Sequence, residues 1–404
     1  MMRRPSNAGV HNAQSRDAGH GSRMRWQDDE STSAPWRVGV LFSQSGFMAL
    51  IEETQFRGTM LAIDEINAKG GINGRELQPV IYDPASDNAL FRSHAHRMLA
   101  KEGLSTIFGC YTSSSRKAVL PVLERLNGLL WYPTLYEGFE YSPNVIYTGA
   151  APNQNSLALC DYLLETYGPR FYFVGSDYIY PHESNRIMRE LLAQRGGEVV
   201  GETYVPLNSR RHDFLPVMRD IKEAQPDVIF STVVGEATVF LYQAFSDFGL
   251  DPKTCPIASL TTTEAEIAAM GADVGEGHIT AASYFQGIEG ERNRDFVSRY
   301  HKRYGDDAPT NMCVEAAYFQ VHMFAKALEY TNSIDPDILR PMVLGQKFEA
   351  PQGVVSINPR CSHANVWSRI GKAKRSGQFE ILRQSLAPVL ADPYLVGTER
   401  PAMI

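Results

Sequence analysis

The stretch Phe108-Gly109-Cys110-Tyr111-Thr112-Ser113-Ser114-Ser115-Arg116-Lys117 decides the fold prediction. It continues the apolar run that begins at Ser105, and apolar residues at helical spacing follow it: Ala118, Val119, Val122, Leu123 and Leu126. This order predicts a strand, a tight turn and a helix N-terminus, where Ser and Thr side chains cap unpaired backbone N–H groups. Because open α/β sheets bind ligands at the carboxyl ends of their strands, we interpret the hydroxyl cluster as part of a binding site.

The length and charge of the chain limit the classes of protein that it can belong to. At 404 residues, two domains are expected. The formal net charge of -7 argues against direct binding of nucleic acid, which needs a basic face. The five cysteines are widely spaced, with no metal-ligand spacing among them, so we predict reduced thiols and no metal site.

Residues 1–35 are polar and lack an apolar run long enough for a signal-peptide core, so we predict a disordered N-terminal arm. No later segment is apolar enough to insert into a membrane. These features predict a cytoplasmic protein. A true start codon further upstream that encoded a signal peptide would instead place the protein in the periplasm.

Strand and helix patterns alternate along the rest of the chain, which predicts parallel sheets covered by helices on both faces. The glycines of Gly70-Gly71-Ile72-Asn73-Gly74 lie between a helix and a following strand, the reverse of a dinucleotide-binding fingerprint, so no cofactor is expected. We predict an N-terminal lobe of residues 36–149 plus 284–334 and a C-terminal lobe of residues 150–283 plus 335–404. Three crossovers would join these two doubly wound α/β lobes around a ligand cleft.

Several segments resemble one known family. They are Gly109-Cys110-Tyr111 with 115–119, Tyr132-Pro133-Thr134 with Tyr136-Glu137-Gly138, and the stretches 151–155, 175–178 and 350–353. Over residues 37 to about 394, the chain resembles the type I periplasmic-binding proteins, a Leu/Ile/Val-binding-protein-like family. The similar branch holds the amide-sensing negative regulator of the bacterial aliphatic amidase operon and the urea and short-chain amide receptors of ABC transporters. The resemblance implies a ligand-binding protein of the type I fold, not an enzyme.

Two positions separate these two groups. Urea receptors usually have tryptophan at the position of Tyr111 and tend to have valine at that of Thr134, so this chain resembles the regulator there. That resemblance implies a cytoplasmic small-amide sensor that negatively regulates amidase expression by sequestering an RNA-binding antitermination protein. Other stretches, such as 113–121 and 127–133, are equally similar to a urea receptor, so a urea or short-chain amide substrate-binding protein of an ABC transporter stays the alternative. The sequence does not fix the oligomeric state, and a homo-oligomer is compatible with it.

The resemblance also implies which residues contact the ligand: Tyr111, Ser113, Tyr132, Thr134 and Tyr178, with Tyr136 and Tyr180 close by. Hydroxyl groups suit the carbonyl and NH2 of a small amide or urea, and tyrosines supply flat apolar walls. No acidic residue lies in the 111–115 turn or the 132–134 segment, which favours an uncharged ligand. Cys110 has no histidine near it in the sequence, so we expect a buried thiol and no catalysis.

Overall fold

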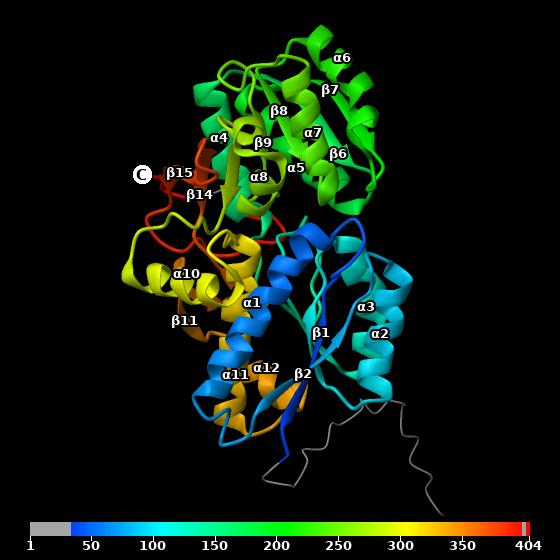
Figure 1. The fold of residues 1–404 in the computed structure, drawn as a ribbon, viewed down its shortest axis with the longest axis vertical. Coiled ribbons are helices and arrows are strands. Elements are labelled where there is room, and N and C mark those ends of the chain that lie inside the picture. Colours follow the sequence, from blue (N-terminus) through cyan, green and yellow to red (C-terminus); the bar gives the residue numbers. More distant parts are fainter. Residues whose placement is uncertain (1–33, 398–400) are drawn as a thin grey trace, which may run out of the picture.

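The computed structural model describes residues 34–397 and 401–404, and it divides into two α/β lobes (Figure 1). Most of the predicted N-terminal arm, residues 1–33, lies outside the described residues. The predicted type I periplasmic-binding-protein fold is confirmed, because each lobe is built on a largely parallel sheet flanked by helices. In the described part of the chain, no helix is long and apolar enough to cross a membrane.

The first lobe is built on a five-stranded sheet whose neighbouring strands are all parallel. Its order is β2 (Leu77–Tyr82), β1 (Trp36–Leu41), β3 (Thr106–Gly109), β4 (Leu129–Tyr132) and β5 (Val145–Tyr147). Successive residues of β3 and β4 point to opposite faces. Phe108 and Trp131 pack on Phe324 of α11 (Met312–Thr331), with ring centroids 5.4 and 6.2 Å away. Ile107 and Leu130 belong to the core beneath α2 (Asn88–Ala100) and α3 (Ser113–Leu126).

The second lobe is built on a seven-stranded sheet. Its order is β15 (Phe379–Gln384), β14 (Arg369–Ala373), β10 (Ile279–Ala282), β9 (Ile257–Ser259), β8 (Val228–Thr232), β6 (Arg170–Ser176) and β7 (Glu198–Val205). The strands from β7 to β10 pair in parallel, whereas β14 and β15 are antiparallel additions at one edge. The helical segments of this part are α4 (Pro152–Thr166), α5 (Ile179–Arg195), the 3-10 turn η1 (Arg211–Asp213), α6 (Phe214–Ala224), α7 (Glu236–Asp247), α8 (Glu264–Met270) and α9 (Ala272–Gly275).

The chain passes between the two sheets three times: after β5, after β10 and again before β14. After β10, α10 (Glu291–Tyr304) and α11 return to the first lobe, where α11 packs along α1 (Ala49–Ala68). We expected everything from residue 335 onward to pack on the second lobe, and the structure differs. The segments α12 (Pro336–Val343), β11 (Lys347–Ala350), β12 (Gly353–Ile357) and β13 (Ala364–Asn365) precede the third passage, and α12 and β11 pack against α11. Apolar contact with the returning helix therefore holds them beside the first lobe.

The turn after β3 places the hydroxyl cluster at the edge of the sheet. A Cβ on Gly109 would lie 2.5 Å from the carbonyl oxygen of Leu41, so only glycine allows β3 to approach β1 this closely. Cys110 then adopts a left-handed backbone with φ 68°, and its N–H donates to the same Leu41 oxygen at 3.0 Å. This sharp reversal brings Tyr111 and the first residues of α3 to the carboxyl edge of the sheet.

Candidate ligand-binding site between the lobes

A small cavity of about 10 Å³ lies where the carboxyl ends of strands from both sheets face each other. Its wall consists of eight uncharged side chains: Tyr111, Ser113, Thr134, Leu135, Tyr178, Tyr180, Val234 and Thr261. The first four belong to the first lobe and the last four to the second. A space of this size holds about one water molecule, so the two lobes are closed upon each other.

The first-lobe wall is built by the starts and ends of regular elements. Thr112 caps α3, and its hydroxyl accepts the Ser115 N–H at 3.0 Å, which makes Ser113 the first residue of the helix. Thr134 lies two residues beyond β4, and its hydroxyl accepts a hydrogen bond of 2.8 Å from the side-chain amide of Gln55. The hydroxyl groups of Thr112 and Thr134 are therefore each held in place by a buried partner.

Half of the second-lobe wall is aromatic. Tyr178 and Tyr180 lie at the junction of β6 and α5, and Thr261 follows β9, with its hydroxyl donating to the Val233 carbonyl at 3.0 Å. Burial raises the pKa of Tyr111, Tyr178 and Tyr180 above the ordinary value of 10.0, so these phenols stay neutral. The wall thus offers flat apolar surface with neutral polar tips.

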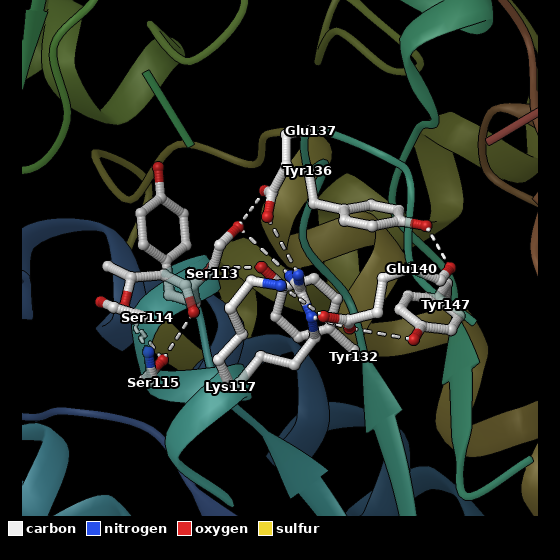
Figure 2. Close-up of polar contacts among 12 residues, drawn as sticks. Ser113, Ser114, Ser115, Lys117, Tyr132, Tyr136, Glu137, Glu140 and Tyr147 are labelled. Carbon is white, nitrogen blue, oxygen red and sulfur yellow. Dashed lines mark hydrogen bonds and ion pairs between the residues drawn. The ribbon is translucent and has the colours of Figure 1, made fainter. Parts of the chain in front are cut away.

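A buried charged cluster lies directly behind Ser113 (Figure 2). Arg116 is fully buried; its Nε donates to Glu140 at 2.7 Å and its Nη2 lies 3.3 Å from Glu137. Ser113 joins the cluster, because its hydroxyl donates to Glu137 and accepts from Arg116 Nη1 at 3.2 Å. Burial raises the pKa of Glu140, but the charge of Arg116 and hydrogen bonds from Arg116 and Lys117 outweigh it and lower this pKa to about 2. The cavity wall is therefore uncharged, whereas the layer directly behind it contains ion pairs.

Five of the seven predicted ligand contacts line the cavity, namely Tyr111, Ser113, Thr134, Tyr178 and Tyr180. Tyr132 and Tyr136 lie outside its lining, and the guanidinium of Arg116 lies 4.8 and 4.6 Å from their ring centroids. The Tyr132 hydroxyl donates to the Tyr111 carbonyl at 2.6 Å, and that of Tyr136 pairs with His363. In this closed form these two tyrosines support the wall from behind.

Sequence reasoning missed Leu135, Val234 and Thr261 as members of the wall. The sequence pattern predicts strands over 228–234 and 257–260, so Val234 ends one of them and Thr261 follows the other, and their place at the carboxyl edge was a usable signal. The pairing of Ser113 with Glu137 had no local signal, because 24 residues and an irregular loop separate them. Cys110 is buried and burial raises its pKa, so the thiol is held in its unreactive form.

Several contacts join the lobes across the cleft, among them α1 with α8 and α3 with α5, and two of them involve named groups. The N–H of Glu236, at the start of α7, donates to the carbonyl of Phe47 in the first lobe at 3.2 Å. The Arg186 guanidinium of α5 lies 5.1 Å from the ring centroid of Phe139, in the loop after β4. Gly235 has φ 67°, and a Cβ there would lie 2.7 Å from the Phe47 carbonyl oxygen, so this approach requires glycine. Both contacts belong to the closed arrangement of the lobes.

Buried carboxyl groups also lie near the connections between the lobes. Burial raises the pKa of Glu264 to about 8 and that of Glu266 to about 7, both in the first turn of α8. Burial also raises the pKa of Glu315, in α11, to about 8. The described residues hold no group of three or more His, Cys, Asp or Glu side chains suited to a metal ion.

Comparison with known proteins adds the family context. Residues 36–400 match the family described as periplasmic binding protein domain. The chain is 27% identical over 337 residues to Leu/Ile/Val-binding protein homolog 6 of Brucella abortus, which covers 81% of this chain and 84% of that protein. It is 25% identical over 322 residues to the leucine-, isoleucine-, valine-, threonine-, and alanine-binding protein of Pseudomonas aeruginosa, covering 78% of this chain and 84% of the relative.

Solved structures share the fold. The solute-binding protein of an ABC transporter from Rhodopseudomonas palustris HaA2, in complex with p-hydroxybenzoic acid, superposes with a TM-score of 0.81 at 23% identity, covering 90% of this chain and all of the other. The branched-chain amino acid transporter substrate-binding protein of Streptococcus pneumoniae, in complex with isoleucine, gives a TM-score of 0.76 at 18% identity, with 86% and 99% covered. The proteins named in these comparisons are binding proteins.

Proposed function

Because the chain belongs to the periplasmic binding protein family, we propose that it is the solute-binding protein of an ABC transporter for urea or a short aliphatic amide. The observation that carries this proposal is the uncharged wall of the cavity. The ligands named for the solved relatives, isoleucine and p-hydroxybenzoic acid, each carry a carboxyl group. A cleft walled by hydroxyl, phenol and aliphatic groups suits a small neutral ligand better than these acids.

The size of the ligand limits the affinity. An amide of four heavy atoms gains at most about 1.5 kcal/mol per atom, or about 6 kcal/mol in all, which corresponds to a Kd of about 10 to 100 µM. The cavity of about 10 Å³ is smaller than such a ligand, so entry requires the lobes or the wall side chains to separate. Closure around the ligand then supplies the conformational change that a transporter reads.

A second candidate function is an amide-responsive regulator that sequesters an RNA-binding antitermination protein. One observation favours it: Tyr111 and Thr134, the two positions at which the sequence resembles the regulator, both line the cavity. In this function, lobe closure changes the surface shown to the partner. If this function is correct, the two proteins should co-purify, and millimolar acetamide should separate them. A complex that acetamide leaves intact would argue against the regulator.

Titration calorimetry with acetamide, propionamide, butyramide, formamide and urea tests the binding proposal. At least one of these ligands should bind, and those of four heavy atoms should bind no more tightly than the limit given above. Leucine and 4-hydroxybenzoate are the comparison ligands. Tighter binding of either of them than of every amide and urea would refute the proposal.

A further inference from the structure

Ser113 lines the cavity, and the hydrogen of its hydroxyl is already donated to a protein partner. A serine hydroxyl has one hydrogen to donate and two lone pairs to accept with. Here the hydrogen goes to Glu137 Oε2, and one lone pair receives Arg116 Nη1 at 3.2 Å. What remains for a ligand is one lone pair, so Ser113 can only accept a hydrogen bond from the cavity side.

Glu137 is held so that this direction cannot reverse. Its side chain is 3% exposed, and its other oxygen lies 3.3 Å from Arg116 Nη2. Arg116 is itself fixed by Glu140 and by the two tyrosine rings that flank it. A carboxylate paired with a guanidinium only accepts hydrogen bonds, so the Ser113 hydrogen must point toward Glu137 and away from the ligand.

The Thr134 hydroxyl, like that of Ser113, can offer the ligand only an acceptor lone pair. It accepts from the Gln55 amide at 2.8 Å, and its hydrogen is directed at the Cys110 carbonyl, 3.4 Å away. The first-lobe wall therefore presents two hydroxyl oxygens as acceptors. An NH2 group, with two N–H donors on one nitrogen, is the complement of such a pair.

Resting on the proposed function, we infer that Glu137 is a positioning residue that makes the cleft select a ligand with an NH2 group. By fixing Ser113 as an acceptor, it favours a carboxamide or urea over a carboxylate of the same shape. Glu137 does so without touching the ligand, from behind the serine.

The substitution Glu137→Gln tests this inference because it should reverse the serine. The new amide oxygen stays toward Arg116, which can only donate, so the amide nitrogen takes the place of Oε2 and donates to Ser113. The serine hydrogen must then point into the cavity. Calorimetry with acetamide and acetate, each of four heavy atoms, should show at least about tenfold preference for acetamide in the wild type and a ratio near one, or below it, in the variant.

Glu140→Gln is the matched control, since it removes a carboxylate from the same arginine without touching Ser113. It should leave the acetamide-to-acetate ratio close to that of the wild type. If Glu137→Gln weakens both ligands by one factor, or if both variants shift the ratio equally, Glu137 is only structural or only electrostatic and the inference is refuted.

A measurement on the wild type keeps the inference testable if Glu137→Gln does not fold. Acetone replaces the NH2 of acetamide by a methyl group and should bind at least about fivefold more weakly; equal affinity would refute the inference. A different calorimetric result would refute the proposed function itself: the wild type would bind neither urea nor any amide. That result would refute both the proposed function and the role inferred for Glu137.

Discussion

Gly235→Ala should weaken ligand binding by blocking lobe closure. The added Cβ would lie 2.7 Å from the Phe47 carbonyl oxygen, whereas ordinary contact begins at 3.4 Å, so the lobes must separate there by about 0.7 Å. The hydrogen bond from the Glu236 N–H to the same oxygen, now 3.2 Å, would lengthen to about 3.9 Å and be lost. Loss of one such bond costs about 1 kcal/mol, which lowers the ratio of closed to open forms about fivefold and the apparent affinity by up to the same factor.

Gly249→Ala is the matched control. Gly249 has φ 66°, close to the 67° of Gly235, but a Cβ there would meet nothing within 4 Å. Both substitutions place alanine in the left-handed region and should each lower the free energy of unfolding by about 1 to 2 kcal/mol. Only Gly235→Ala should also weaken acetamide binding.

Titration calorimetry measures the affinities of the two variants for acetamide. Small-angle X-ray scattering of the ligand-free proteins measures lobe closure, and it does not depend on the identity of the ligand. The Gly235→Ala protein should have the larger radius of gyration. Equal affinities and equal radii for the two folded variants would show that the Phe47 contact does not hold the lobes together.

Three further predictions follow from the same structure. Thr134→Val removes an acceptor from the wall and should weaken acetamide binding about fivefold in calorimetry; unchanged affinity would exclude Thr134 as a contact. Tyr136→Phe removes the hydroxyl that pairs with His363 and should lower the free energy of unfolding in guanidinium chloride by about 1 kcal/mol; a wild-type denaturation midpoint would contradict this. The pKa of Glu264 is about 8, above the ordinary 4.5, so the stability it contributes below pH 4.5 is lost as pH rises through about 8. Between pH 6 and 9 the melting temperature of the wild type should therefore fall more steeply than that of Glu264→Gln. The glutamine oxygen can still accept the hydrogen bond from the Gln286 N–H, and parallel pH profiles of the two proteins would contradict this prediction.

Much of the fold could be predicted because its central strands, such as β3, β4 and β8, are buried apolar runs, and because turn residues mark the bounds of the others. The pattern predicts strands from Leu77 to Tyr82 and from Glu198 to Val205, and these bounds are those of β2 and β7, since turn residues or a helix end flank each of them. The start of α3 lies at Ser113, before the apolar pattern begins at Ala118, because its first turn is stabilised by the Thr112 cap and not by core packing. Periodicity alone places such a start too late.

Strands β14 and β15 could not be predicted in the same way. They are antiparallel additions to the edge of the second sheet, and β15 is mostly half-exposed, so neither has a continuous apolar run. Helix α8 was also missed, although Thr263 and Glu266 form a capping box that marks its start.

In the candidate site, too, some residues could be predicted from local sequence and others could not. Residues at strand ends, such as Tyr111, Thr134 and Tyr178, are placed by the local pattern of strand and turn. The layer behind them depends on the path of residues 133–144, which brings Glu137 and Glu140 back onto Arg116. No periodicity encodes that return, because tertiary packing alone determines it.

The packing of α11 along α1 means that the first lobe is complete only after the chain has passed through the second lobe, so no single cut separates two continuous domains. A fragment that ends after β5 would lack the helix against which Phe108 and Trp131 pack. Heat should therefore melt both sheets in one calorimetric peak, and genetic dissection at a lobe boundary should yield aggregation instead of two autonomous folding units.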